Sequence, residues 1–230
     1  MTVTSNGSTS GGASETENKP LGLRERSRRE TLNRIRKAAV ELLAEKGYEQ
    51  ITTREVAQRA EVGEATLFRY VSSKHELLLL VIGDKMDHDI EAIIEADARS
   101  AVEAGDRGAH NYLSRVHAVY RARADFYLQD PENVTSYLQY AFVAGSQLGA
   151  QNGAQGDRII DLVASIIAEG QEAGALFAAV DARVVAQNCQ GIYVHEVLRR
   201  SVRGFTFESL GERVRTRLDA QLLPLVLAGR

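Results

Sequence analysis

Hydrophobic residues recur three and four positions apart along most of the 230-residue chain, which is the spacing of one face of an α-helix. From about Arg28, a stripe that includes Leu32, Ile35 and Leu43 continues until Gly47, where the pattern stops. No segment shows the sustained two-residue alternation of a half-buried strand. The pattern therefore predicts an all-α protein of about nine helices.

The same spacing, together with helix start and stop signals, places the later elements. Helices are predicted over 53–60, over 64–70, from 74 to at least 98, over 109–127, from Asp130-Pro131 through Phe142, around 159–170, from Asp181 through Val197, and over 206–225. The glycine-rich run GAQNGAQG at 149–156 predicts a loop. The last two helices carry apolar stripes, which either close the core of one protomer or face a partner.

Residues 51–76 carry the densest set of local signals. Thr52 is followed three positions later by Glu55, and Ser73 by Glu76, and each pair fits a capping box at a helix start. Between them, Glu61-Val62-Gly63 has the length of the turn in a helix-turn-helix, with Gly63 expected to take an unusual backbone conformation. So small a unit needs a helix behind it, and residues 28–46 provide one.

This segment, TTREVAQRAEVGEATLFRYVSSKHELL at 52–78, resembles the DNA-binding domain of the tetracycline-repressor (TetR) family of bacterial regulators. The resemblance is specific from about Thr31 to Leu78 and continues more weakly over 169–192. It implies an N-terminal three-helix helix-turn-helix DNA-binding domain at 24–73 and a C-terminal helical domain for ligand binding and dimerisation at 74–230. Residues 1–23, rich in Ser, Thr and Gly, predict a flexible tail.

The resemblance implies a homodimer that binds a palindromic operator in double-stranded DNA, as a repressor that a small-molecule effector releases. Two rival functions stay open: a ligand-independent or architectural DNA-binding regulator, and a helical enzyme with a vestigial DNA-binding domain. No Gly-rich phosphate loop, paired-cysteine spacing or nucleophile motif occurs, so the sequence predicts neither an enzyme nor a cofactor. The single cysteine, Cys189, favours the reducing cytoplasm, and no run of 18 apolar residues predicts a membrane span.

The helix that begins at Glu64 is expected to lie in the major groove, where side chains distinguish base pairs. Ala65 and Thr66 offer methyl groups to thymine, and Lys74 lies at a helix start that suits a phosphate. Together with the resemblance, these arguments give nine candidate DNA contacts: Thr53, Arg54, Glu64, Ala65, Thr66, Phe68, Arg69, Tyr70 and Lys74. Phe68 alternatively packs in the core, and Lys74 is alternatively a solvated helix start.

The chain departs from the usual family pattern at four positions in this segment. Glu61 replaces the turn glycine, Gly63 replaces the common Ser or Thr cap, Ala65 replaces a frequent glycine, and Phe68 replaces a common tyrosine. These changes bear on the base and phosphate contacts more than on the fold.

Charge is unevenly distributed along the chain. Residues 1–80 hold 13 Lys and Arg against 11 Asp and Glu, a net of +2, and residues 81–230 hold 15 against 20, a net of −5. Seven of the basic residues fall between Arg24 and Lys37. This cluster is either an electrostatic footprint for phosphate or a solvated arm with no fixed site.

The middle helices are rich in tyrosine and phenylalanine. Buried hydroxyl groups need partners, which a ligand pocket supplies, although core packing explains the same residues nearly as well. The resemblance favours a cavity, with these candidate ligand-binding residues: Tyr112, His117, Tyr120, Phe126, Tyr137, Tyr140, Phe142, Phe177, Cys189 and Tyr193.

The candidate dimer-interface residues lie on the last two helices: Val185, Ile192, Glu196, Arg200, Leu210, Val214, Leu218 and Leu222. His88, Glu91 and Glu95 share one helix face that is able to hold a metal, but a solvated polar face is the favoured interpretation. No metal site is therefore predicted.

Overall fold

The computed structural model describes residues 22–103, 108–141, 147–203, 206 and 209–227. Within these ranges the chain forms nine α-helices, two short 3-10 helices and no strand, so the predicted all-α fold is confirmed. None of the helices in these ranges is long and apolar enough to cross a membrane. Residues 1–21 of the predicted tail lie outside the described residues.

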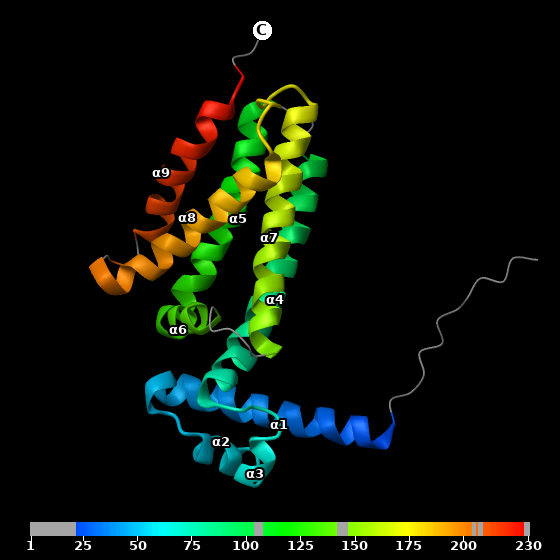
Figure 1. Cartoon of the computed structure of the whole chain (residues 1–230), viewed down its shortest axis with the longest axis vertical. Coiled ribbons are helices and arrows are strands. Elements are labelled where there is room, and N and C mark those ends of the chain that lie inside the picture. Colours follow the sequence, from blue (N-terminus) through cyan, green and yellow to red (C-terminus); the bar gives the residue numbers. More distant parts are fainter. Residues whose placement is uncertain (1–21, 104–107, 142–146, 204–205, 207–208, 228–230) are drawn as a thin grey trace, which may run out of the picture.

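Three helices form a small unit at one end of the molecule (Figure 1): α1 (Leu23–Lys46), α2 (Thr53–Arg59) and α3 (Glu64–Leu67). From this unit α4 (Lys74–Glu103) rises into a larger helical body. The body is completed by α5 (Ala109–Gln129), α6 (Pro131–Ala141), α7 (Gln147–Glu172), α8 (Ala182–Arg203) and α9 (Leu210–Leu222). Within it α8 packs on α7, and α9 packs on both α5 and α8.

The first part of α4 belongs to both the small unit and the body. Seven consecutive residues, 77–83, are buried, so this part of the helix is enclosed on every side. A helix that is apolar all round is a core helix. One continuous cluster of buried side chains accordingly runs from Ile35 in α1 to Leu225 after α9.

Residues 223–227, called the strap here, pair with the connection between α7 and α8. The Phe177 N–H donates to the Leu225 carbonyl at 2.8 Å, and the Leu227 N–H donates to the Ala175 carbonyl at 3.1 Å. Between these bonds, Leu176 and Val226 form an isolated antiparallel bridge. The strap therefore closes the end of the body where α7 ends.

Two helix starts differ from the prediction. Helix α1 begins at Leu23 rather than near Arg28, and α9 begins at Leu210 rather than near 206. The predicted cap at Asp181 is confirmed, because its Oδ1 accepts the N–H groups of Arg183 and Val184.

The predicted loop at 149–156 is wrong, because this glycine-rich run lies within α7. Each glycine costs a helix about 1 kcal/mol relative to alanine, so packing must compensate. Gln155 shows how: its side chain is buried, its Oε1 accepts from the Tyr137 hydroxyl at 2.5 Å, and its Nε2 donates to the Gly83 carbonyl at 2.9 Å. The bonds join α7 to α6 and to α4.

The apolar stripe of α9 faces the core of its own protomer. Its four members, Leu210, Val214, Leu218 and Leu222, are at most 2% exposed, and Val185 on α8 is also buried. The expectation that these five side chains face a partner is therefore corrected, since the stripe closes the protomer. Ile192 is partly buried, and the side chain of Arg200 lies outside the described residues.

Glu196, another candidate interface residue, instead joins α8 to α9 within the protomer. Its fully buried carboxylate accepts from Arg213 Nε at 2.8 Å and pairs with Arg217 Nε at 2.6 Å and Arg199 Nη1 at 3.5 Å. Burial acts to raise the pKa of Glu196, but the hydrogen bond from Arg213 and the three arginine charges outweigh it. The pKa of Glu196 therefore lies below its ordinary value.

Because the folded-state pKa of Glu196 is lowered, the stability it contributes is present above the unfolded-state pKa and is lost as the pH falls through the folded-state pKa. We expect Glu196→Gln to lower the free energy of unfolding by about 1–3 kcal/mol at pH 7, and by much less near pH 3. Urea unfolding at the two pH values measures this difference. Glu212→Gln, an exposed change on α9, is the control, and an equal loss for Glu196→Gln at both pH values would contradict the role of its charge.

Candidate nucleic-acid interface and ligand cavity

Glu61, not Gly63, takes the unusual backbone conformation in the turn between α2 and α3. Glu61 has φ +55°, whereas Gly63 is extended, with φ −71° and ψ 148°, as the residue before α3. The Glu61 N–H donates to the Gln58 carbonyl at 3.1 Å and the Val62 N–H to the Ala57 carbonyl at 3.0 Å. These two bonds form the Schellman motif that ends a helix with a left-handed residue, normally glycine.

Two predicted capping arrangements fix the helices around this turn. At Thr52, the full capping box is present: its Oγ1 accepts from Glu55 N–H at 3.2 Å, and Glu55 Oε2 accepts from Thr52 N–H at 3.0 Å. At Ser73 only one of the two hydrogen bonds of the predicted capping box is present. Ser73 Oγ accepts from Glu76 N–H at 3.3 Å, but the Glu76 side chain accepts from Ser72 N–H instead of Ser73 N–H. The second box is thus shifted by one residue on its return bond.

Ion pairs hold α2 against α1. Lys46 Nζ donates to Glu55 Oε1 at 2.6 Å, and the Arg59 guanidinium contacts Glu45 at 2.9 Å and Glu41 at 3.4 Å. The hydrogen bond from Lys46, with those from Thr52, lowers the pKa of Glu55. Both ends of α2 are therefore tied to α1, which fixes the direction in which α3 projects.

The candidate DNA contacts on α3 are presented outward while Leu67 anchors the helix. Leu67 is fully buried, whereas Glu64, Ala65 and Arg69 are exposed and Phe68 is 46% exposed. That exposure contradicts the alternative that Phe68 is a core aromatic. Thr66 and Tyr70 are partly buried, as is Thr53 on α2, while Arg54 is exposed.

The outward residues already contact one another. Arg69 Nη2 donates to Thr66 Oγ1 at 3.1 Å, and Arg54 Nε lies 3.7 Å from Glu64 Oε1. The second pair is exposed, and exposed pairs contribute little to stability. DNA is therefore able to replace these contacts without large cost.

Lys74 combines an internal contact with an available charge. Its Nζ donates to the Glu49 carbonyl at 2.9 Å and lies 4.6 Å from the centre of the Tyr48 ring. An ammonium group has three donors, so this bond leaves donors for a phosphate. Lys74 is therefore not merely a solvated residue at a helix start, because its side chain contacts Glu49 and Tyr48.

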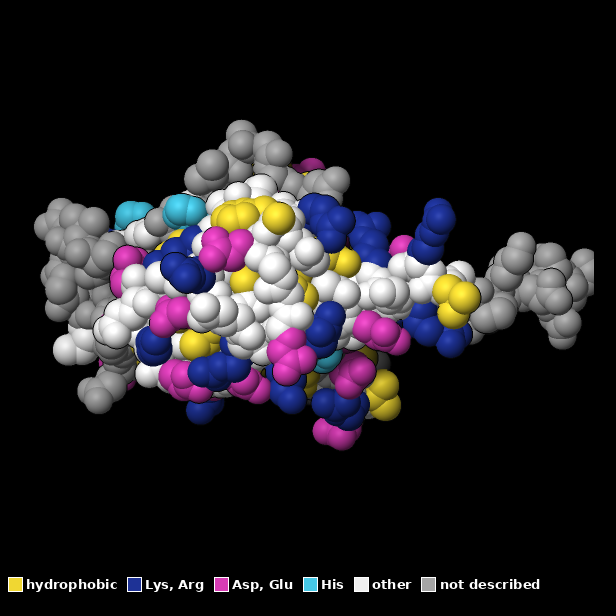
Figure 2. All heavy atoms as spheres, turned by 90° about the horizontal axis from the view of Figure 1, so that it is seen from below, with side chains coloured by type: hydrophobic (Ala, Val, Ile, Leu, Met, Phe, Trp, Pro, Cys, Tyr) yellow, Lys and Arg dark blue, Asp and Glu magenta, His cyan; other side chains and the backbone are white. Residues whose placement is uncertain are grey.

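Basic and acidic side chains alternate over this end of the molecule (Figure 2). The cluster between Arg24 and Lys37 lies on α1, and its members at 24, 26, 28, 29, 34 and 37 are exposed. Arg36 instead pairs with Asp84 on α4, although its Nε lacks hydrogen-bond geometry. Burial raises the pKa of Asp84, against the opposing effect of the Arg36 charge.

A cavity of about 410 Å³ lies in the body among α4, α5, α6, α7 and α8. Its apolar wall includes Met86, Ile90 and Val194, and its polar wall is formed by Arg123, Tyr137, Gln155 and Gln190, with Asp157 also lining it. Asp157 is exposed, whereas Arg123 and Gln155 are buried. A largely apolar cavity with a few fixed polar groups is typical of a small-molecule site.

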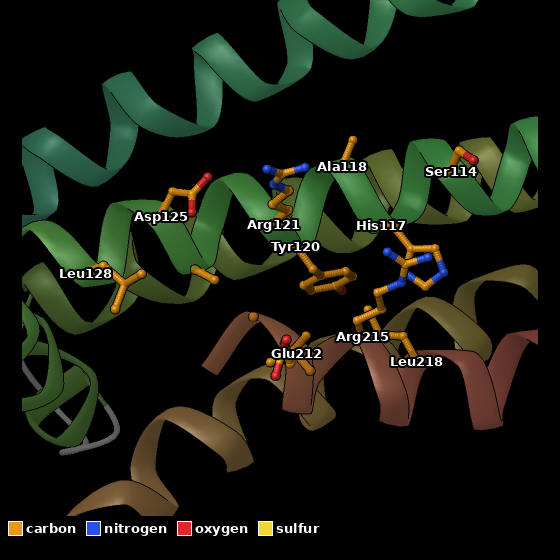
Figure 3. Close-up of a pocket in the computed structure, with 13 residues that line it drawn as sticks. Ser114, His117, Ala118, Tyr120, Arg121, Asp125, Leu128, Glu212, Arg215 and Leu218 are labelled. Atoms are coloured by element: carbon orange, nitrogen blue, oxygen red, sulfur yellow. The ribbon is translucent and has the colours of Figure 1, made fainter. Parts of the chain in front are cut away.

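A second hollow of about 550 Å³ lies between α5 and α9 (Figure 3). His117 and Tyr120 line it, and His117 Nε2 lies 2.9 Å from Asp219 Oδ1. Burial lowers the pKa of His117 and outweighs the opposing effect of Asp219. This hollow has no wall on α4, unlike the cavity.

The structure separates the candidate ligand residues. Only Tyr137 lines the cavity itself, while Tyr112, Phe126 and Tyr193 are buried elsewhere in the core. Phe177, which follows α7, is 46% exposed and does not line the cavity. The Tyr140 side chain and Phe142 lie outside the described residues.

Cys189 is fully buried, and burial raises the pKa of its thiol to about 12. A thiol that stays protonated at neutral pH is unreactive, which supports the interpretation of Cys189 as a small core residue. Among the described residues no group of three His, Cys, Asp or Glu side chains is arranged to hold a metal ion. In particular, His88 Nδ1 lies 2.7 Å from the Asp84 carbonyl one turn earlier.

A family model described as bacterial regulatory proteins of the tetR family matches residues 35–81, which span α1 to the start of α4. This segment of the chain, from within α1 to the start of α4, is similar to that family. The HTH-type transcriptional repressor KstR of Mycobacterium tuberculosis is 28% identical over 146 residues, 63% of this chain and 62% of that protein. The uncharacterized HTH-type transcriptional regulator YvkB of Bacillus subtilis is 48% identical over 50 residues, 22% of this chain and 26% of that protein. The chain thus matches less than two thirds of either relative's length.

Solved structures resemble this chain over most of its length. FadR of Thermus thermophilus, in complex with lauroyl-CoA, superposes with a TM-score of 0.65 and 20% identity, covering 86% of this chain and 97% of that one. FadR of Bacillus subtilis, in complex with stearoyl-CoA, gives a TM-score of 0.59 and 21% identity, covering 81% and 96%. At these identities the likeness shows the shared fold.

The sequence prediction missed most of the residues that line the cavity, among them Arg123, Gln155 and Gln190. Arg123 had a usable signal, since it lies on the apolar stripe of α5 between Tyr120 and Tyr127. A charged residue on a core-facing stripe needs a partner or a ligand. Gln155 gave no such signal in the sequence, because the glycine-rich run around it predicted a loop.

Replacing Glu61 by the glycine that is usual in the TetR family removes the Cβ that opposes the left-handed conformation. We expect Glu61→Gly to raise the free energy of unfolding by about 0.5–1 kcal/mol, measured by urea denaturation. Gln58→Gly, an exposed change inside α2, is the matched control and should lower it by about 1 kcal/mol. Equal effects of the two changes would show that Glu61 is not strained.

Proposed function

We propose that the protein is a transcriptional regulator that binds a palindromic operator as a homodimer and leaves it when a small-molecule effector binds. In this proposal it acts as a repressor in the cytoplasm and catalyses no reaction. The observation that carries it is α3, which exposes Phe68 and Arg69 from a unit braced by α1 and α2. The family match over 35–81 supports the same function for this unit.

In the proposal residues 24–73 read DNA and residues 74–230 bind the effector and the second copy. The nine candidate contacts on α2, α3 and the start of α4 form the reading surface. A dimer would place two copies of α3 in successive major grooves, about 34–36 Å apart. Since the α9 stripe is core, the second copy is expected on other faces of α8 and α9, where Val184 and, just after α9, Leu223 are more than half exposed.

Helix α4 is the proposed link between effector and DNA. Gly83 receives the hydrogen bond from Gln155, which lines the cavity, and the adjacent Asp84 pairs with Arg36 of α1. A ligand that displaces Gln155 would therefore act on α4 next to its contact with the DNA-reading unit. Its effect is limited to its difference in affinity for the two states.

The structural neighbours suggest what size of effector to test. Both FadR structures hold an acyl-CoA, and this chain shares their fold with a cavity that is mostly apolar. We propose an effector with a long apolar portion. This assignment is carried over from the neighbours and is tested by binding lauroyl-CoA to the purified protein.

Lys74→Ala is expected to weaken operator binding on all sequences alike and to reduce the slope of log affinity against log salt by about one unit. It should also lower the free energy of unfolding by about 1 kcal/mol, because the bond to the Glu49 carbonyl is lost. Fluorescence anisotropy at several salt concentrations measures the first effect. Lys85→Ala, the same change at an exposed position on α4, should leave the slope unaltered, and an unaltered slope for Lys74→Ala would remove it from the phosphate contacts.

Phe68→Ala separates recognition from folding. Because the side chain is 46% exposed, the free energy of unfolding should change by less than about 0.5 kcal/mol. Operator binding should weaken by about 1–3 kcal/mol if the ring contacts DNA. The operator comes from an unbiased selection with the wild-type protein, and failure of that selection to yield any symmetric site would overturn the proposed function.

A further inference from the structure

Helix α5 carries two buried arginines with opposite surroundings. Arg115 is 5% exposed and is fully paired, with Nε and Nη2 donating to Asp97 at 2.8 Å each and Nη1 to Glu169 at 2.6 Å. Arg123, about two turns further on, is 4% exposed and forms no ion pair among the described residues. Arg115 shows what a purely structural buried arginine looks like in this protein.

The contacts that Arg123 does make are weak ones. Its Nη1 donates to Gln190 Oε1 at 3.3 Å, its guanidinium carbon lies 4.5 Å from the centre of the Tyr193 ring, and its Nε has no partner in the part of the chain described. A buried cation without a counter-charge is costly, typically several kcal/mol. Such a group is retained where a ligand completes it.

Asp89 on α4 is an acidic group whose charge interacts with that of Arg123 without direct contact. No contact of 4 Å or less joins the two groups, and Asp89 Oδ2 has no partner in the described ranges. Burial raises the pKa of Asp89, and the Arg123 charge only partly opposes this. Arg123 therefore lies within the electrostatic reach of a carboxylate that it does not touch.

Apart from Arg123 and its few polar neighbours, the wall of the cavity is mostly apolar. Met86, Ile90, Leu138, Ile160 and Val194 supply hydrophobic surface, and Gln190, the partner of Arg123, lies on the same wall. Asp157, the only acidic side chain among the lining residues, is exposed. An anionic group is thus favoured beside Arg123 and an apolar group against the aliphatic residues.

We infer that the effector is an amphiphile with one anionic head, bound by Arg123 and Gln190, and an apolar tail that fills the rest of the cavity. This inference rests on the proposed function, since it names the ligand class of the same cavity. The head is a carboxylate or a phosphate, because both accept the charge-assisted hydrogen bonds of a guanidinium. A fatty acid supplies the first and an alkyl phosphate the second.

Isothermal titration calorimetry without DNA tests the inference with three probes: dodecanoate, dodecanol and dodecyl phosphate. Each is kept below its micellar concentration. Dodecanoate or dodecyl phosphate should bind at least roughly tenfold more tightly than dodecanol, since only the alcohol lacks the anion. The tighter of the two identifies the head as carboxylate or phosphate. Equal affinities for all three probes, or tightest binding of dodecanol, would overturn the inference.

Single substitutions test whether Arg123 binds the anionic head of the probe. Arg123→Gln should weaken the tighter anionic probe at least tenfold and leave dodecanol unaffected, whereas Arg123→Lys should recover part of the loss. Asp89→Asn should tighten the anionic probe, because it removes the competing carboxylate. Arg121→Gln, an exposed change two residues away on α5, is the matched control and should change neither probe.

Two measurements guard these variants against misreading. Circular dichroism establishes whether each variant is folded. If Arg123→Gln does not fold, the test relies on Arg123→Lys and Asp89→Asn. Unchanged affinity of the anionic probe for both of these variants would overturn the inference. Operator selection is performed separately with the wild-type protein. A protein that selects a symmetric operator but prefers no anionic probe refutes the ligand class alone, whereas one that selects no operator refutes the proposed function.

Discussion

The enclosure of α4 between two groups of helices is the constraint on which the structure depends. Seven successive buried residues, 77–83, pack against α1 on one side and against the body on the other. Neither unit is able to move relative to this segment without exposing apolar surface, at about 25 cal/mol for each Å². The helix therefore transmits a displacement as a rigid element, because packed cores switch between discrete arrangements instead of deforming continuously.

Polar contacts decide where on α4 a displacement would begin. Gly83 and Asp84 are consecutive in α4. The Gly83 carbonyl accepts a hydrogen bond from Gln155 of α7, and the Asp84 carboxylate forms an ion pair with Arg36 of α1. In the proposed switch, a change at Gln155 would reach the unit of α1, α2 and α3 through the two consecutive residues Gly83 and Asp84. Short coupling of this kind requires only that two arrangements of α4 differ in free energy by a few kcal/mol.

Local signals let the sequence predict the helices, because capping boxes and apolar stripes act within a few residues. The Thr52 box, the Asp181 cap and the reading unit of α1, α2 and α3 follow from such signals. The sequence predictions are wrong where contacts with residues distant in the sequence determine the structure. The run at 149–156 is helical through the bonds of Gln155 to α6 and α4, and the α9 stripe is core because α5 and α8 cover it. Likewise, the partners of Arg115 and the lack of them at Arg123 lie on other helices, which no spacing along α5 reveals.

The position of the strap bears on the order in which the protein is made. Residues 223–227 follow the nine helices of the described ranges, so they leave the ribosome after these helices have been synthesised. Until then Leu176 has no backbone bridge to Val226, and the end of the body near α7 stays open. The DNA-reading unit, whose helices are complete before residue 75, is by contrast available for folding early in translation. Pairing of the strap with the connection between α7 and α8 is accordingly the last of these contacts that becomes possible during translation.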